Sequence, residues 1–540
     1  MIVLGINGSF GSPAQDAAAV FMKDGKILFA AEEERYSRIK YSPGKMPLLA
    51  IKKGLEYLNL NISDIDVVAF HGATWQKEID NTLKDFFYNH FHFQTEIKRY
   101  HHHLGHAASA YFSSGFNESL VFTMDGSGDG DSAHVYSVSN GDFELLDSYK
   151  RPQSLGIFYT AVTQVCGYQK DRDEYKTMGL AAFGEKTTYD FSDFLFFENG
   201  RYSVNEKYLS AFVPGMPSPD QQQMVYSEKM LQQFQLKRRI EKDIPQVYKN
   251  FAASAQFKLE QTILQWVLYW VNKTQIYNVC FAGGVALNCL ANKVIYQNET
   301  VKKFYVPPVA ADMGVALGNA YLATHENKIS IQKLEHTYLG DDFPDEKILD
   351  TIEKCNVKYS HVKDIVNETV SILEKGNVIG WFQGRMEYGP RALGNRSILC
   401  LPFSKLMKDI VNQKVKFRES YRPFGASVLE EDSHIFFENI KEYAPYMTIV
   451  FDVKKEMYNS IPAVTHNDGT CRIQTVNINQ NKLFYKLLCE VKQKTGKGIL
   501  LNTSFNLDNE PIVNTPRQAI ASFFSSGLDA LVIGNYIIRK

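Results

Sequence analysis

Two distant segments of the chain carry the same order of structural signals. In both residues 2–34 (IVLGINGSFGSPAQDAAAVFMKDGKILFAAEEE) and residues 119–150 (SLVFTMDGSGDGDSAHVYSVSNGDFELLDSYK), a glycine-rich turn follows an apolar run. A second apolar run, a hairpin signal (KDGK or SNGD) and a third run come next. Asp-Gly and Asn-Gly between strand-like runs are strong hairpin signals. Two such units about 115 residues apart predict a duplicated α/β fold, with two unrelated β-meanders as the alternative.

Helical and strand patterns alternate along the rest of the chain. Helices are predicted over 46–60, 80–96, 102–112 and 250–272, and the segments 276–296 and 302–324 each read as strand, turn and helix. The composition becomes polar around residues 328–346. We therefore expect two domains, residues 1–335 and residues 345–540, the second of mixed α/β type.

The overall composition excludes several classes of protein. A net charge of −1 over 540 residues argues against a general nucleic-acid binder. The seven cysteines form no C-x-x-C pair, which favours reduced thiols over disulfides or zinc fingers. The first residues lack a signal-peptide pattern, and no apolar run is long enough to span a membrane. We expect a soluble, cytoplasmic protein without nucleic-acid or membrane partners; no pattern indicates its oligomeric state.

The segment HHHLGHAAS offers a candidate metal site. His102 and His106 are four residues apart, so on a helix they share one face and can chelate one ion. The alternative is a polar helix start. Asp125 and Asp312 each follow a strand-like run in a glycine-flanked turn and could complete the set. Two imidazoles and two carboxylates suit Fe(II), Mn(II) or Zn(II), and spacing does not choose among them.

Two glycine-rich turns are candidate nucleotide contacts. They are MDGSGDGDS (124–132) and AGGVALN (282–288). Backbone N–H groups in such turns can approach a phosphate closely. Ordinary tight-turn chemistry gives the same pattern, so each turn alone is weak evidence.

Basic residues are concentrated in the C-terminal part of the chain. They lie in GRMEYGPRALGNRS (384–397), NQKVKFRESYRPFG (412–425) and HNDGTCRIQTV (466–476), and LNTSFN (501–506) adds polar donors. The guanidinium groups among them are those of Arg385, Arg391, Arg396, Arg418, Arg422 and Arg472. Guanidinium groups held in Gly/Pro turns can grip phosphate bidentately. The pattern predicts a site for a small phosphate ligand; solvated arginines paired with glutamates are the alternative.

Together these motifs resemble the O-carbamoyltransferase family, which includes tobramycin, cephem and nodulation-factor carbamoyltransferases. The resemblance covers nearly the whole chain, with the motifs in family order. They are EEERYSRIK, HHLGHAASAY, DGSGDG, YKTMGLAAFG, AGGVALN, VPPVAADMGVALG, GPRALGNRS, YRPFG, GTCRIQTV and LNTSFN. The resemblance implies an N-terminal domain of the duplicated actin/hexokinase-like superfamily, followed by an α/β YrdC-like domain.

The resemblance also implies a two-step reaction. The YrdC-like domain would convert carbamoyl phosphate and ATP, with Mg, into carbamoyl-adenylate. The N-terminal domain would then transfer the carbamoyl group to a hydroxyl of a sugar or sugar-containing acceptor, near Fe(II) or another divalent ion. A mixed anhydride of this kind is prone to hydrolysis, so making and using it within one protein limits its loss to water.

Site residues follow from the motifs that match. The implied metal ligands are His102, His106, Asp125 and Asp312. The implied carbamoyl phosphate ligands are Arg391, Arg422 and Arg472. The implied nucleotide and activation pocket comprises Lys416, Arg418, Asn502, Ser504, Gly283, Gly284 and Asn288. Asp16 and Lys40 are the candidate catalytic residues.

One departure from the family pattern concerns the acceptor step. Gln15 precedes Asp16 where the family has histidine as its candidate general base, and neutral Gln cannot usefully accept a proton. Either Asp16 or another group replaces it, or the chain is a carbamoyl-adenylate-forming or -binding homologue with altered or lost transfer. Two further alternatives are a sugar kinase of the same superfamily and a fused tRNA threonylcarbamoyl-adenylate enzyme.

Overall fold

The structure, a computed structural model, describes residues 1–11, 16–74, 76–210 and 224–540. It divides into two compact units. Unit 1 comprises Met1–Phe70, Phe87–Lys98 and Glu326–Lys540, and unit 2 comprises His71–Phe86 and Arg99–His325. Gln15 lies outside the described residues. The compact units are groups of residues that lie near one another, and they do not test where one domain ends and the next begins. The division into domains 1–335 and 345–540 therefore stays a prediction.

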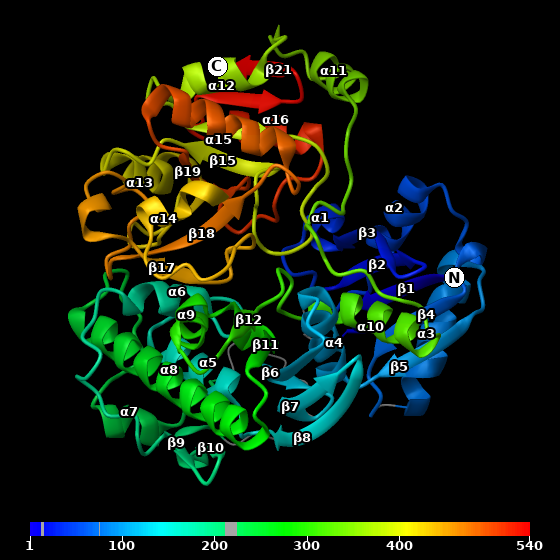
Figure 1. The fold of residues 1–540 in the computed structure, drawn as a ribbon, viewed down its shortest axis with the longest axis vertical. Helices are drawn as coiled ribbons and strands as arrows, with labels where there is room; N and C mark the ends of the chain where they lie inside the picture. Colours follow the sequence, from blue (N-terminus) through cyan, green and yellow to red (C-terminus); the bar gives the residue numbers. More distant parts are fainter. Residues whose placement is uncertain (12–15, 75, 211–223) are drawn as a thin grey trace. The chain divides into compact units, whose positions relative to one another are not determined.

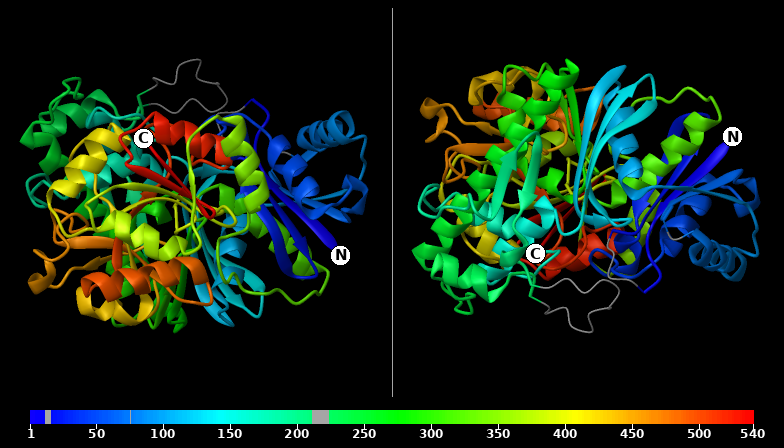
Figure 2. Two further views of the ribbon diagram at one scale, coloured as in Figure 1. Left: turned by 90° about the horizontal axis from the view of Figure 1, so that it is seen from above. Right: turned by 90° about the horizontal axis from the view of Figure 1, so that it is seen from below.

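A five-stranded sheet, drawn largely from unit 1, holds the first repeat. Its order is β3 (Lys26–Glu32), β2 (Ala18–Lys23), β1 (Ile2–Asn7), β4 (Val67–His71) and β5 (Glu96–Tyr100). β1 pairs antiparallel with β2 and parallel with β4. The three N-terminal strands, drawn in blue, run side by side in both views of Figure 2. The predicted Asp24–Gly25 hairpin connects β2 to β3.

The second repeat forms a sheet in unit 2 with the same topology. Its order is β12 (Lys303–Tyr305), β11 (Asn278–Ala282), β6 (Glu118–Gly128), β7 (Asp131–Ser139) and β8 (Asp142–Lys150). β6 pairs antiparallel with β7 and parallel with β11, as β1 does with β2 and β4. The repeated topology confirms the duplicated α/β fold predicted for the N-terminal part.

Helices of unit 2 pack against this second sheet. They include α4 (His102–Ser114) and α8 (Gln246–Thr274), the long green helix in Figure 1, while α10 (Met313–Glu326) packs against α4. Trp266 of α8 packs edge-on against Phe122 of β6, with ring centroids 5.0 Å apart. Ala107 and Tyr111 of α4 join the buried cluster on the sheet. Even so, none of the described helices combines the length and apolar character that crossing a bilayer requires.

A nine-stranded mixed sheet forms the C-terminal part of unit 1. Its order is β13 (Ser360–His361), β21 (Tyr536–Arg539), β20 (Ala530–Ile533), β14 (Ile379–Phe382), β15 (Arg396–Cys400), β19 (Ile499–Ser504), β16 (Gly425–Leu429), β18 (Thr470–Val476) and β17 (Val450–Asp452). α12 (Ile365–Leu373) and α15 (Lys482–Thr495) bury their apolar faces in its core. Asp364 and Asn481 cap these helices by accepting backbone N–H bonds. The predicted α/β class is confirmed.

One predicted helix has different ends. The pattern predicts a helix over 80–96, whereas α3 spans Gln76–Phe91 and β5 begins at Glu96. His92 has a φ of 50°, the left-handed conformation that commonly ends a helix. The expected helix is therefore wrong over its last residues, because a local backbone reversal is invisible to hydrophobic periodicity.

Candidate functional site

Four candidate metal ligands lie together in unit 2. His102 and His106 project from the first turns of α4, Asp125 lies in β6, and Asp312 directly precedes α10. The two Nε2 atoms are 3.0 Å apart, and each lies 3.2–3.3 Å from Asp125 Oδ2. His106 Nε2 is 3.4 Å from Asp312 Oδ1. One ligand atom from each residue fits within 4.8 Å of the others.

The ring orientations suit a shared ion. The planes of His102 and His106 meet at 79°, with centroids 4.6 Å apart. Both planes can therefore pass through a single point in front of the two Nε2 atoms. Ligands about 2.1 Å from a tetrahedral ion are separated by about 3.4 Å, close to the separations found here. The residues present thus fit a divalent cation such as Fe(II).

The fold brings Asp312 to the histidines through close helix packing. A Cβ added to Gly318 of α10 would lie 1.7 Å from the carbonyl oxygen of Gly105 in α4, so the two helix backbones touch. This contact places the start of α10 beside the face of α4 that carries the histidines. Asp129, which no sequence pattern singles out, accepts N–H bonds from His102 (2.8 Å) and Gly72 (3.2 Å) and holds the start of α4.

Charges in this cluster are strongly coupled. Burial alone would lower the pKa of His106, but hydrogen bonding to Asp125 and Asp312 and their charges raise it to about 9. Burial would likewise raise the pKa of Asp125, but the hydrogen bonds of His102 and His106 hold it well below its usual range. The raised pKa favours a protonated His106 imidazole. A metal ion that binds this imidazole must therefore displace the proton.

A second histidine group, His101 with Asp131 and His134, differs in geometry. His134 Nε2 lies 2.8 Å from Asp131 Oδ2, and His101 Nε2 lies 3.4 Å from the same oxygen. However, the rings of His101 and His134 are stacked, 4.8 Å apart with planes only 22° apart, and His103 stacks on His134 at 4.7 Å. One ligand atom from each residue of this group also lies within 4.8 Å of the others, but here both Nε2 atoms contact a single carboxylate oxygen and, among the described residues, no second carboxylate joins them. We interpret this group as a hydrogen-bonded stack.

The second glycine-rich turn adjoins the metal candidate. Gly283 and Gly284 follow β11, and a Cβ on Gly284 would lie 3.2 Å from Asp125 Oδ1. Gly283 lies against the backbone of Met124, where a Cβ would come within 2.1 Å of the carbonyl oxygen. Asn288 caps α9 (Cys289–Gln297) by accepting the N–H of Ala291 at 3.1 Å. The turn therefore places backbone that carries no side chain next to the carboxylate of Asp125.

In unit 1, the nine-stranded sheet places Arg472, a predicted carbamoyl phosphate ligand, on the same face as Asn502. Arg472 of β18 and Asn502 of β19 are both in register with Gly425 of β16, so their side chains leave the same face of the sheet. Asn502 Nδ2 donates to the carbonyl oxygen of Ala392 at 3.4 Å. The segment carrying Arg391 thus crosses the same face as Arg472.

Arg422 reaches the region from the chain just before β16. Its guanidinium lies 3.6 Å from Glu419 and 3.7 Å from Asp508, separations of loose ion pairs. It also contributes, with Arg418 and Lys40, to the positive field that acts on Lys416. The structure therefore brings Lys40, Lys416, Arg418 and Arg422 into one electrostatic neighbourhood.

Lys416 is fully enclosed by oxygen atoms. Its Nζ donates to the carbonyl oxygen of Ser504 at 2.6 Å and to Oδ1 of Asn506 at 2.6 Å. Burial, together with the charges of Arg418 and Lys40, lowers the pKa of Lys416 well below its ordinary value. Arg418 in turn donates to Asn412 Oδ1 at 2.7 Å. Both side chains are therefore held in place by contacts within the protein.

Asp16, the other candidate catalytic residue of unit 1, lies beside the segment of Lys40. Its N–H donates to the carbonyl oxygen of Tyr41 at 2.8 Å, and its own carbonyl accepts from Asn7 at 3.1 Å. Asp16 has a φ of 60°. The backbone of Asp16 is therefore fixed next to Lys40 by contacts within unit 1.

Two other arginines of the 384–397 segment donate hydrogen bonds to backbone carbonyl oxygens of the protein. Arg396 donates to the carbonyl oxygens of Gln383 (2.7 Å) and Gly384 (3.0 Å) and is completely buried. Arg385 donates to the carbonyl oxygen of Gly340 at 3.0 Å. Backbone carbonyl oxygens thus accept from both side chains, neither of which is among the implied carbamoyl phosphate ligands.

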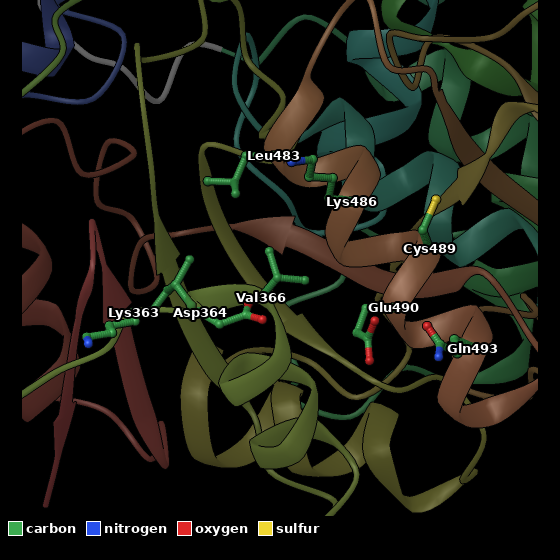
Figure 3. A pocket seen from close by; sticks show the side chains of 9 residues that line it. Lys363, Asp364, Val366, Leu483, Lys486, Cys489, Glu490 and Gln493 are labelled. Carbon is green, nitrogen blue, oxygen red and sulfur yellow. The ribbon is translucent and has the colours of Figure 1, made fainter.

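The groove drawn in Figure 3 lies elsewhere, between the start of α12 and one face of α15. Its lining residues are Lys363, Asp364, Ile365, Val366, Leu483, Lys486, Cys489, Glu490 and Gln493. None of the residues selected from the sequence lines it. The groove mixes both signs of charge, and nothing in its chemistry singles out a ligand.

Comparison with known proteins now decides the family. Residues 88–321 match the family described as Carbamoyltransferase N-terminus, and residues 370–540 match Carbamoyltransferase C-terminus. Nodulation protein NolNO of Sinorhizobium fredii is 35% identical over 97% of this chain and 79% of its own length. The chain belongs to the O-carbamoyltransferase family. This carbamoyltransferase is therefore a transferase enzyme, and the predicted family resemblance is confirmed.

Other similar proteins are more distant. The 3'-hydroxymethylcephem-O-carbamoyltransferase of Amycolatopsis lactamdurans is 26% identical over 97% of both chains. Among solved structures, full-length HypF in its phosphate- and nucleotide-bound form is 14% identical and covers 60% of this carbamoyltransferase and 55% of its own chain, with a TM-score of 0.40. The N-terminal family match contains the His/Asp cluster, and the C-terminal match contains Arg391, Arg422 and Arg472.

Proposed function

We propose that this carbamoyltransferase hydrolyses carbamoyl phosphate to carbamate and inorganic phosphate, and joins the carbamate to the α-phosphate of ATP, with Mg, as carbamoyl-adenylate with release of pyrophosphate. It then transfers the carbamoyl group to a hydroxyl of a sugar-containing acceptor, and AMP leaves. The observation that carries the proposal is the shared sheet face of unit 1, where Arg472 and Asn502 flank Gly425 beneath the segment of Arg391. Guanidinium groups are well suited to binding a small dianion. The cephem relative, whose name states an O-carbamoyl product, supports a hydroxyl acceptor.

In the activation step, Arg391, Arg422 and Arg472 would bind carbamoyl phosphate. Their positive charge would offset the repulsion between two phosphate-bearing substrates. Lys416 would shape the pocket by fixing the loop of Ser504 and Asn506, to which it donates three of its bonds. Arg418 and Asn502 would hold the neighbouring backbone in the same way.

In the transfer step, His102, His106, Asp125 and Asp312 would hold Fe(II) or another divalent cation. When bound, such an ion supplies Lewis acidity toward a carbonyl or phosphoryl oxygen. The turn of Gly283 and Gly284, with Asn288 anchoring the helix behind it, would present backbone N–H groups to the nucleotide. Asp16 would accept the proton of the acceptor hydroxyl, and Lys40 would stabilise negative charge beside it.

Product identity tests the proposal. The purified chain, incubated with ATP, Mg and carbamoyl phosphate, should release inorganic phosphate and pyrophosphate, and AMP should follow when the adenylate is consumed. No pyrophosphate should form without carbamoyl phosphate. Mass spectrometry of candidate nucleotide sugars and glycans added to the reaction should then detect the carbamoyl mass. Formation of ADP with a phosphorylated acceptor would contradict the proposal and favour a sugar kinase.

The replacement of histidine by Gln15 motivates one alternative, a homologue that forms or binds carbamoyl-adenylate without efficient transfer. A Gln15→His variant separates the two. If the variant gains transfer to an acceptor on which the native chain is inactive, the alternative is favoured. An active native chain excludes it.

A further inference from the structure

A buried ionic clamp in unit 1 joins the N-terminal motif EEERYSR to the loop that carries Arg391. Gly389 N–H donates to Glu32 Oε1 at 2.7 Å, and Arg35 Nη2 donates to the carbonyl oxygen of Gly389 at 2.7 Å. Arg35 also contacts the same Glu32 oxygen at 3.2 Å. One ion pair thus grips both polar groups of a single residue more than 350 positions away.

The clamp is completely removed from solvent. Glu32 is 2% exposed and Arg35 1%. Burial raises the pKa of Glu32 to about 7 against the opposing charge of Arg35, so the carboxylate is costly to keep there. Apolar residues of the same volume would stabilise a core as well or better, so a buried ion pair is better explained by the geometry it specifies.

The geometry it specifies is that of the Arg391 loop. Gly389 has a φ of 126°, a conformation that residues with a side chain rarely adopt, and it lies two residues before Arg391. On the other side of Arg391, Glu387 Oε1 accepts N–H bonds from Leu393 (2.7 Å) and Asn395 (2.9 Å). The loop is therefore fixed on both sides of its arginine, by Glu387 from within and by Glu32 and Arg35 from the N-terminal segment.

We propose that Glu32 and Arg35 are positioning residues for carbamoyl phosphate activation, because they lock the backbone at Gly389 and so aim the guanidinium of Arg391. The inference rests on the proposed function, in which Arg391 binds carbamoyl phosphate. It assigns to the N-terminal motif a task in the first half-reaction. Loss of the clamp should therefore weaken substrate binding more than it slows the chemistry of bound substrate.

Glu33 provides a matched control. It follows Glu32 directly and is similarly buried, at 4% exposure. Its carboxylate accepts N–H bonds from Leu49 (3.2 Å) and Ala50 (2.8 Å) at the start of α2 (Leu48–Leu58), not from the Arg391 loop. Glu33→Gln therefore disturbs the same motif without touching Gly389.

The experiment compares native protein, Glu32→Gln, Arg35→Lys and Glu33→Gln. Pyrophosphate release should show KM for carbamoyl phosphate raised about tenfold in the first two variants with kcat changed by less than about twofold, and unchanged KM in Glu33→Gln. Equal KM values in Glu32→Gln and Glu33→Gln would overturn the proposal. So would a fall in kcat alone.

Hydrogen exchange provides a readout that does not depend on activity. In Glu32→Gln and Arg35→Lys, the amides of residues 388–396 should exchange faster, whereas in Glu33→Gln the faster exchange should lie at residues 48–52. If the native chain releases no pyrophosphate, the proposed function fails, and the exchange pattern still decides whether the clamp holds the loop. Unaltered exchange at 388–396 in both clamp variants overturns the positioning role.

Discussion

The His/Asp cluster of unit 2 and the cationic region of unit 1 use their charged groups differently. In unit 2, the ligand atoms of His102, His106, Asp125 and Asp312 approach one another, and the two imidazole planes cross. In unit 1, Arg396 and Lys416 are each surrounded by oxygen atoms of the chain itself. The first arrangement suits a common ion, whereas in the second these side chains bind oxygen atoms of the protein itself. Charge density in a sequence therefore overstates the number of ligand-binding groups.

The largest effect should follow removal of Arg391. Arg391→Ala should lower carbamoyl phosphate-dependent pyrophosphate release by roughly a hundredfold or more, because a charge-assisted contact to a phosphate is lost. Bound metal should stay unchanged, since the His/Asp cluster is intact. The matched control is Arg539→Ala, which removes an exposed pair with Glu368 and should leave release unaffected. Equal loss of pyrophosphate release in both variants would show that the effect is not specific to Arg391.

Arg396 should give the opposite result. Its guanidinium is completely buried, lies against backbone carbonyls and stacks on Phe382 at 3.7 Å. Arg396→Ala should therefore lower the free energy of unfolding by about 3 kcal/mol or more, as measured by urea denaturation. A variant of native stability that has lost only carbamoyl phosphate binding would show that Arg396 contacts substrate after all.

The sequence predicts features that depend on neighbouring residues, but not contacts between segments far apart in the chain. Hairpin turns and apolar runs predicted the two repeated sheets, and an i,i+4 spacing predicted that His102 and His106 share a face. Asp129 was not found, because its bonds to His102 and Gly72 join chain segments that no local pattern relates. The clamp of Glu32 and Arg35 was missed for the same reason. A run of glutamates after an apolar strand was the one visible sign that charge is buried there.

Proton competition should govern metal binding in unit 2. The pKa of His106, raised to about 9 by Asp125 and Asp312, keeps the metal-free imidazole protonated at neutral pH. An incoming cation must displace that proton, so the apparent affinity should rise about tenfold per pH unit from pH 6 to 8 and level off near pH 9. Titration of Fe(II) or Zn(II) into apoprotein across this range measures it. An affinity independent of pH would contradict the assignment of His106 as a ligand.

The stacked histidines should give the smallest effect. His134→Gln removes one ring of the stack and its contact with Asp131, so bound metal per chain should change by less than about twofold. Elemental analysis beside His102→Asn, which should lose most of the metal, makes the comparison within unit 2. Loss of metal in both variants would show that the two histidine groups form one site.

The central claim is that the two half-reactions use separate sets of residues. The most direct measurement is pyrophosphate release and carbamoyl transfer in a His106→Asn variant, alongside its bound metal. Metal and transfer should be lost, while carbamoyl phosphate-dependent pyrophosphate release should stay within about threefold of the native rate. Simultaneous loss of release and transfer in a variant that remains folded would contradict the separation of the two sets of residues.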